Sequence, residues 1–445
     1  MIARRTWRRP ARLVVVAFGL VTLGGTGLLM LPVSAESGHG TGFVTALFTA
    51  TGAICGGLAS VDTGSHWTVF GELVVLALIQ VGGLGIMTLA SLLVLLMSRR
   101  LGMRMQLTAA AETSSVGVGD LRRVLAGVVV ASFLIEAVTA AVLIARFATS
   151  YGMPFGRAVY HGVFHSISAF NNAGFGLYRD NLIGFATDPI VMVPVMVAMI
   201  AGGLGFPVLL EIARRLRRKP MHWSIHTKIT IGVYLGLTVV GGLAIVGLEW
   251  AQPGTLGPMG VGDKLMVGTF HSVTPRTAGF NSLDVGQLQP ATLLVTDILM
   301  FIGAGSASTA GGIKVTTFAL LAFVMLAEVR GEPTVHVLGR RLPATVQRQA
   351  LTVALLGVGV VIAGTLGVLV LTELPLDVVL FEACSAFGTV GLSTGITGQL
   401  PAAGQLILVA LMLIGRLGPI TVASALALRE RPRRYELPEE RPVVG

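Results

Sequence analysis

Long apolar stretches alternate with shorter polar ones along the whole chain. Eight of them are long enough for a membrane-spanning helix of ~20 residues. They lie near residues 13–31, 70–97, 124–147, 189–213, 226–250, 291–327, 348–372 and 404–428. Within each successive pair of stretches, a semi-apolar segment of about ten residues is too short to span. The pattern predicts an all-α polytopic membrane protein with eight spanning helices and four re-entrant segments.

The composition agrees with a membrane protein and excludes the soluble enzyme classes. Of 445 residues, 53% are hydrophobic and only 12% are charged, whereas soluble proteins usually carry about 25% charged residues. The two cysteines, Cys55 and Cys384, provide neither a disulfide framework nor the spacing of a metal site. No Ser/His/Asp or Cys/His arrangement predicts nucleophilic catalysis, so we expect no enzyme and no cofactor in this chain.

Basic residues are concentrated on one predicted side of the membrane. Of the 32 lysines and arginines, 25 lie at the N-terminus, in the second, fourth and sixth loops, or in the C-terminal tail. By the positive-inside rule, both termini and these loops are cytoplasmic. The net charge of +10 therefore needs no nucleic acid to explain it, and we expect membrane lipid but no nucleic acid as a partner.

The first apolar stretch also has features of a signal peptide. Arginines precede it and Val33-Ser34-Ala35 follows it. Its ~19 apolar residues exceed a usual signal core, and it fills a position that the repeat below requires. We expect a retained helix.

The remaining loops contain an internal repeat. In each, a phenylalanine is followed nine or ten positions later by a glycine and then by leucine or phenylalanine; the glycines are Gly57, Gly174, Gly279 and Gly391. A second glycine-rich string follows inside the next apolar stretch, beginning at Gly82, Gly202, Gly303 and Gly415. Recurrence at about 110 residues predicts four units of helix, re-entrant segment and helix. Their bounds are 1–97, 98–213, 214–327 and 328–445.

The four re-entrant segments have the properties of an ion filter. Non-helical backbone at membrane depth is tolerated where protein buries it or water wets it. Carbonyls there can replace the hydration shell of a cation, and glycine lets them approach an axis without a Cβ. The candidate filter residues are Ile54, Cys55, Gly56 and Gly57; Asn171, Asn172, Ala173 and Gly174; Arg276, Thr277, Ala278 and Gly279; and Gly388, Thr389, Val390 and Gly391. The alternative, close helix packing through glycine, suits the second strings better.

Small polar residues interrupt the sixth apolar stretch. Residues 303–314 contain four glycines, two serines and a threonine, which make a poor helix. They do not form a phosphate-binding loop, because Lys314 is separated from Gly312 by Ile313 and no strand precedes them. Such a loop could obstruct a pore below the filter; the alternative is a simple helix kink.

Arg416 is a charge deep inside the last apolar stretch. Charges at that depth normally face a wet cavity or a partner. The alternative to a pore-facing arginine is an ion pair with Asp297, Glu136 or Glu382.

Two further polar features have simpler interpretations. His161 and His165 have metal-like spacing, but His165 and His271 occupy equivalent repeat positions, so we expect no metal site. Glu136 could relay protons or ions, or it could make an interhelical polar contact.

These residues together resemble a known family. Val61-Asp62-Thr63-Gly64, the string 171–175, the string 276–281, the 303–314 loop and 415–419 are similar to the Ktr/Trk/HKT superfamily of potassium transporters. The resemblance covers nearly the whole chain and is nearest to the membrane subunit of bacterial Ktr systems. The first filter string, 54–57, departs from the family, which usually has threonine and a β-branched residue there.

The resemblance implies a function and partners. It implies potassium uptake, with potassium bound at the filter glycines, sodium as an activator, a homodimer, and a soluble cytosolic nucleotide-binding ring, all in a bacterial-type plasma membrane. It also implies a gate made of Gly303, Ala304, Gly305, Ser306, Ala307, Ser308, Thr309, Ala310, Gly311, Gly312, Lys314 and Arg416. The alternatives are an ion-coupled secondary carrier with sodium or protons, or a sodium-permeable relative.

Overall fold

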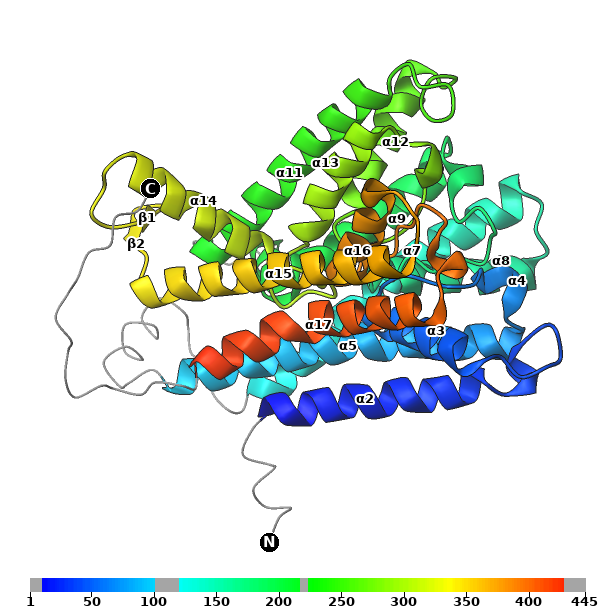
Figure 1. Cartoon of the computed structure of the whole chain (residues 1–445), viewed down its shortest axis with the longest axis horizontal. Helices are drawn as coiled ribbons and strands as arrows, with labels where there is room; N and C mark the ends of the chain where they lie inside the picture. The colour runs from blue at the N-terminus through cyan, green and yellow to red at the C-terminus, as the bar shows by residue number, and fades with distance from the viewer. Residues whose placement is uncertain (1–9, 101–119, 217–222, 428–445) are drawn as a thin grey trace, which may run out of the picture.

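The computed structural model describes residues 10–100, 120–216 and 223–427, and most of them are helical (Figure 1). The basic N-terminal residues before 10, the segment 101–119, residues 217–222 and the tail from 428 lie outside this description. The predicted orientation in the membrane stays a prediction. The helices are α2 (Pro10–Leu29), α3 (Phe43–Cys55), α4 (Thr63–His66), α5 (Val69–Arg100), α7 (Asp120–Ser150), α8 (Phe155–Phe170), α9 (Pro189–Leu204), α10 (Phe206–Leu216), α11 (Ile225–Glu249), α12 (Val261–Val273), α13 (Pro290–Phe301), α14 (Val315–Val329), α15 (Ala344–Leu371), α16 (Leu376–Gly388) and α17 (Ala402–Ala427).

Short elements complete the described part of the chain. Four 3-10 turns lie in the connections, at η1 (Pro32–Ser34), η2 (Ile183–Phe185), η3 (Val285–Gln287) and η4 (Thr397–Gln399). Strands β1 (His336–Val337) and β2 (Arg340–Arg341) form a small antiparallel hairpin between α14 and α15. The class predicted from the sequence, an all-α membrane protein, is confirmed.

Several helices have the length and apolar character of a membrane span. Within the described residues, three qualify by themselves: residues 126–150, Ile225–Glu249 and Ala344–Leu371. A bent pair, α9 with α10, would make a fourth, and shorter apolar helices lie at 15–29, 69–85, 290–301, 315–329 and 402–418. The prediction of eight spanning helices remains a prediction.

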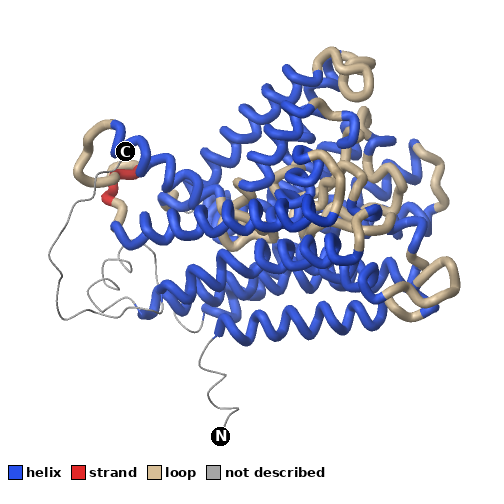
Figure 2. The backbone as a smooth tube through the Cα atoms, in the orientation of Figure 1, coloured by secondary structure: helices blue, strands red, loops and turns tan. Residues whose placement is uncertain are grey.

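Four short helices lie among the long ones. Each of α3, α8, α12 and α16 packs against the long helix that precedes it in the chain: α2, α7, α11 and α15 respectively. Figure 2 shows loop segments in the interior of the molecule, between helices, in addition to those at its ends. Backbone without regular structure is therefore enclosed by helices, as the hydrophobic pattern requires.

The second glycine strings are places of close helix packing. A Cβ added at Gly82, Gly202 or Gly415 would overlap the carbonyl oxygen of Ile54, Phe170 or Phe387, respectively. Each of these carbonyls belongs to the last turn of the short helix that precedes the glycine in sequence. Glycine lets the long helix touch the end of the short one, which is the packing interpretation of these strings.

Two long apolar stretches are broken. The predicted stretch at 291–327 ends as α13 at Phe301 and resumes as α14 at Val315, so the structure contains the expected interruption. The stretch at 189–213, expected as one helix, instead bends by 109° between α9 and α10. The bend lies at Gly205, whose φ of +86° suits glycine. Phe206 N after the bend donates to Ala307 O, so the 303–314 loop occupies the corner.

Candidate functional site

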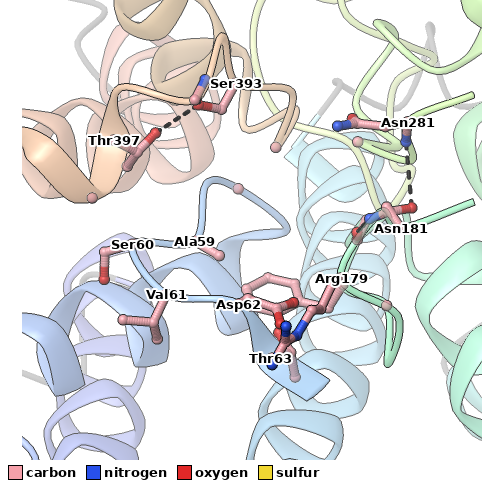
Figure 3. Close-up of a pocket in the computed structure, with 18 of the residues that line it drawn as sticks. Ala59, Ser60, Val61, Asp62, Thr63, Arg179, Asn181, Asn281, Ser393 and Thr397 are labelled. Carbon is pink, nitrogen blue, oxygen red and sulfur yellow. Dashed lines mark hydrogen bonds between the residues drawn. The ribbon is translucent and has the colours of Figure 1, made fainter. Parts of the chain in front are cut away.

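All four re-entrant glycines line one cavity. Gly57, Gly174, Gly279 and Gly391 contribute to the wall of a cavity of about 400 Å³ (Figure 3). They come from positions more than 300 residues apart in the chain, each just beyond the C-terminal end of a short helix. The C-terminal ends of α3, α8, α12 and α16 therefore point their partial negative charge toward the same region.

Each segment after a short helix contains a residue with left-handed backbone. Gly56, Asn172, Thr277 and Thr389 have φ of +70°, +53°, +78° and +51°. Such φ values are uncommon for residues other than glycine. In the second, third and fourth segments this residue lies two positions before the cavity-lining glycine, whereas Gly56 directly precedes Gly57. The first segment therefore has a different local turn.

Carbonyl oxygens of the four segments lie close to glycines of neighbouring segments. The ideal Cβ position of Gly391 is 3.1 Å from Gly57 O and 3.6 Å from Ala173 O. That of Gly174 is 2.8 Å from Ala278 O, and that of Gly279 overlaps the carbonyl oxygen next to Gly391, Val390 O. Val390 O and Ala278 O thus lie where a side chain on the neighbouring segment would stand, so glycine is required at positions 279 and 174. Gly57 O and Ala173 O approach Gly391 less closely.

The candidate filter residues do not all have the same structure. Ile54 and Cys55 form the last turn of α3, and Gly388 is the last residue of α16, so these three are helical rather than extended. Asn171 is the C-terminal cap of α8. Only the residues that follow, such as Ala173, are non-helical, because the short helices run further than the sequence pattern indicated.

Arg276 belongs to the third segment, but its side chain is directed away from the other three. Its guanidinium donates to Tyr234 O and Thr238 Oγ1 on α11, and it lies 3.8 Å from the centre of the Tyr234 ring. The arginine is 1% exposed. The Arg276 side chain therefore anchors the third segment to α11.

The 303–314 loop packs against α9, α17 and the fourth segment. Gly305 N donates to Gly203 O at 2.8 Å, and Thr309 N donates to Gly202 O at 3.3 Å, both on α9. Gly312 N donates to Gly415 O on α17 at 3.2 Å. A Cβ at Gly311 would overlap the Thr389 side chain, so the loop is packed directly against the fourth segment.

Thr309 joins this loop to the second segment. Its hydroxyl lies 2.7 Å from the side-chain amide of Asn172, within hydrogen-bonding distance. The same hydroxyl is 3.4 Å from Phe170 O, at the end of α8. The loop therefore packs directly against the end of α8 and the second segment.

Arg416 is buried against the loop. It is 3% exposed, and its Nη1 donates to Thr309 O. Within the described ranges, no ion pair involves Arg416; the expected alternative partners have other contacts. Glu136 accepts from Gln80, Glu382 accepts from Ser393, and Asp297 lies by Cys384.

The Lys314 side chain contacts the 303–314 loop, to which the sequence analysis assigned it. Its ammonium donates to Ala310 O at 2.5 Å and to Gly311 O at 3.1 Å. These bonds are local and hold the C-terminal half of the loop in one conformation. Lys314 and Arg416 thus place two basic side chains on this loop.

The outer part of the cavity contains polar residues that the sequence pattern did not reveal. Asn181 donates its Nδ2 to Gly174 O at 2.9 Å and accepts from Asn281 N at 3.3 Å, so it connects two segments (Figure 3). Arg179 also lines the cavity, as does Asp62 of the 61–64 string that the sequence analysis had already singled out. Nothing in the repeat pattern singles out Asn181, because only the fold places it next to Gly174 in the second segment.

His161 and His165 stack on each other within α8. His165 Nδ1 lies 2.7 Å from His161 O, and His165 Nε2 accepts from Leu177 N at 3.4 Å. Among the residues that the structure describes, no group of three His, Cys, Asp or Glu side chains is placed to hold a metal ion.

This fold and site define a membrane transport protein for ions. A family model described as "TrkH: Cation transport protein" matches residues 4–433. The chain belongs to this family of cation transporters and is not an enzyme.

Relatives of similar length resemble the chain over nearly their full extent. It is 39% identical to Ktr system potassium uptake protein B of Bacillus subtilis, covering 95% of this chain and 94% of that protein. It is 38% identical to the protein of the same name from Vibrio alginolyticus, covering 98% of this chain and 94% of that protein. It is 32% identical to potassium/sodium uptake protein NtpJ of Enterococcus hirae, covering 98% of this chain and 97% of that protein.

A solved structure has the same fold. The potassium transporter TrkH from Vibrio parahaemolyticus superposes with a TM-score of 0.73 at 16% identity, covering 93% of this chain and 83% of that chain. At this identity the likeness supports the fold alone.

Proposed function

We propose that this chain mediates channel-like potassium uptake through the four segments 54–57, 171–174, 276–279 and 388–391. The observation that carries the proposal is that one glycine from each segment lines a single cavity. Carbonyls from all four segments lie close to the neighbouring glycines, so they can take the place of water around a desolvated cation. Potassium is the substrate, since two of the relatives are named as potassium uptake proteins.

The 303–314 loop and Arg416 act as the gate in this proposal. The loop contacts the second and fourth segments on their inner side. Arg416 holds the loop through Thr309 O and adds a positive charge to the ion path. Both features oppose cation passage while the loop is in place.

The rest of the assembly follows from the same resemblance. The four units 1–97, 98–213, 214–327 and 328–445 surround the pore, and both termini face the cytoplasm of a bacterial-type plasma membrane. The functional form is a homodimer that docks on a soluble nucleotide-binding ring, with sodium as an activator. Pulldown from native membranes tests the ring; flux that ignores added nucleotide, with no soluble partner recovered, would count against it.

A sodium-permeable transporter is the second candidate. The relative from Enterococcus hirae carries both potassium and sodium in its name. A filter of the same geometry with looser carbonyl packing would pass both ions. The ion-coupled carrier is less well supported, because the four segments line one shared cavity, whereas inverted repeats of such carriers face opposite sides.

Uptake of radiolabelled Rb⁺ into potassium-loaded liposomes containing the purified protein tests the main proposal. We expect uptake in the absence of any sodium or proton gradient, with potassium competing much better than sodium. Equal competition by sodium would favour the second candidate. Uptake that requires an imposed sodium or proton gradient would establish a carrier and overturn the channel-like mechanism.

A further inference from the structure

A buried polar cluster lies behind the second segment, away from the cavity. Gln80 on α5 donates its Nε2 to both carboxyl oxygens of Glu136 on α7, at 3.2 and 3.3 Å. Asn171, the cap of α8, donates its Nδ2 to Gln80 Oε1 at 2.8 Å and to Glu136 Oε1 at 3.2 Å. Glu136 and Asn171 are 4% and 1% exposed. Three amide N–H contacts therefore converge on one buried carboxyl group.

Asn171 connects this cluster to the ion path. The next residue, Asn172, begins the left-handed turn of the second segment, with φ of +53°. Its carbonyl oxygen lies 2.6 Å from the ideal Cβ position of Gly56 in the first segment. A shift of Asn171 would thus move the second segment against the first.

The surrounding helices leave little freedom for Asn171. Its Nδ2 also donates to Ile167 O at 2.9 Å, one turn earlier on α8. A Cβ at Gly83 on α5 would overlap Asn171 Oδ1, so the glycine is what makes room for the amide. The side chain is held by α5, α7 and α8 together.

We propose that Glu136 is a positioning residue that sets cation affinity and the preference for potassium over sodium by fixing Asn171. The proposal rests on the proposed function of the second segment. In a Glu136→Gln variant, the new side-chain N–H group would face the donating N–H group of Gln80 or of Asn171, and two donors cannot bond to each other. The cluster would then lose an acceptor, and Asn171 would lose one of its fixed contacts. Looser carbonyls would adapt to a smaller ion, which lowers selectivity.

Glu136→Gln and Asn171→Ala test this inference. Both should raise the KM for Rb⁺ by about tenfold, which is the effect of losing one hydrogen bond to a charged group. Both should lower the Rb⁺/Na⁺ uptake ratio, and the double variant should show no larger effect than either alone. Ser132→Ala is the matched control: Ser132 is buried one turn earlier on α7 and donates only to Val128 O, so its KM and ratio should match the wild type.

Exchanging the two side chains separates positioning from packing. The variant with Gln80→Glu and Glu136→Gln keeps one carboxyl and one amide, and both can again accept from Asn171 Nδ2. We expect it to recover most of the KM and the ratio. A folded Glu136→Gln protein with wild-type KM and ratio would overturn the inference, as would an exchanged variant that fails to recover them or to fold. If the wild type itself takes up no Rb⁺, the proposed function has failed instead, and that result is seen before any variant is compared.

Discussion

Replacing Arg416 by glutamine should speed transport without unfolding the protein. The buried guanidinium donates to Thr309 O, and the described residues contain no carboxylate paired with it. Removing an arginine from an ion pair would leave a buried charge behind, at a cost of several kcal/mol. Here no such charge is left, so the variant should retain the wild-type melting temperature.

The size of the effect can be worked from two contributions. The hydrogen bond from a charged donor stabilises the loop by about 1.5–3 kcal/mol, a factor of roughly 10 to 150 in the equilibrium between closed and open loop. A unit charge ~5 Å from a passing cation adds a barrier of roughly 3 kcal/mol at an effective dielectric of ~20, and water in the cavity reduces it. Backbone bonds from Gly305 and Thr309 to α9 remain in the variant. We therefore expect the initial rate of uptake to rise about tenfold, near the lower limit of the range calculated for the loss of the hydrogen bond.

Initial Rb⁺ uptake and thermal unfolding should be measured on the same preparation. Arg416→Lys keeps the charge but not the reach of the guanidinium, so it should retain most of the barrier. Arg146→Gln removes a charge from the Asp188 ion pair at the start of α9 and should leave the rate unchanged. A stable Arg416→Gln protein with wild-type uptake would refute the reasoning; a destabilised one would indicate a carboxylate partner.

Three other changes have defined outcomes. Gly57→Ser should lower the Rb⁺/Na⁺ uptake ratio, because its Cβ would need space between the first segment and α17; an unchanged ratio in a folded variant would remove Gly57 from the filter. Deleting several residues of 305–310 should raise flux at constant selectivity, and a folded deletion with reduced flux would favour a simple kink. Partial burial acts to raise the Asp188 pKa, but hydrogen bonds from Arg146 and Tyr151 hold it below its usual range. Its contribution to stability is present at neutral pH and is lost as pH falls through that lowered pKa, so the melting temperatures of Asp188→Asn and wild type should converge in acid; a constant difference would contradict this.

The sequence alone was sufficient to establish the class, and it singled out four segments that meet in the structure. The apolar stretches gave helix positions to within a few residues for α11 and α15, because a long apolar run in lipid must form a helix to satisfy its backbone. The four repeated glycines were found by their spacing, and the structure places all four on one cavity. The interruption after α13 was visible because glycine, serine and threonine are unfavourable in the middle of a helix.

Other features depended on contacts between residues that are distant in sequence. Nothing in the apolar stretch at 189–213 indicates the 109° bend at Gly205, since it arises where the 303–314 loop packs into the corner. The sequence placed Arg276 among the candidate filter residues. In the structure its side chain donates hydrogen bonds to Tyr234 and Thr238 on α11.

The sequence determined which residues are apolar, which are small and how often they recur, because these follow from local composition and period. The tertiary structure decided what each buried charge meets. Glu136 and Arg416 are both isolated charges in apolar helices, and the sequence left each with two interpretations. Burial makes an unpaired charge so costly that its contacts decide its role, and the fold gives Glu136 two amides and Arg416 the carbonyl of a loop. Those partners lie up to 107 residues away in the chain, beyond the reach of any local pattern.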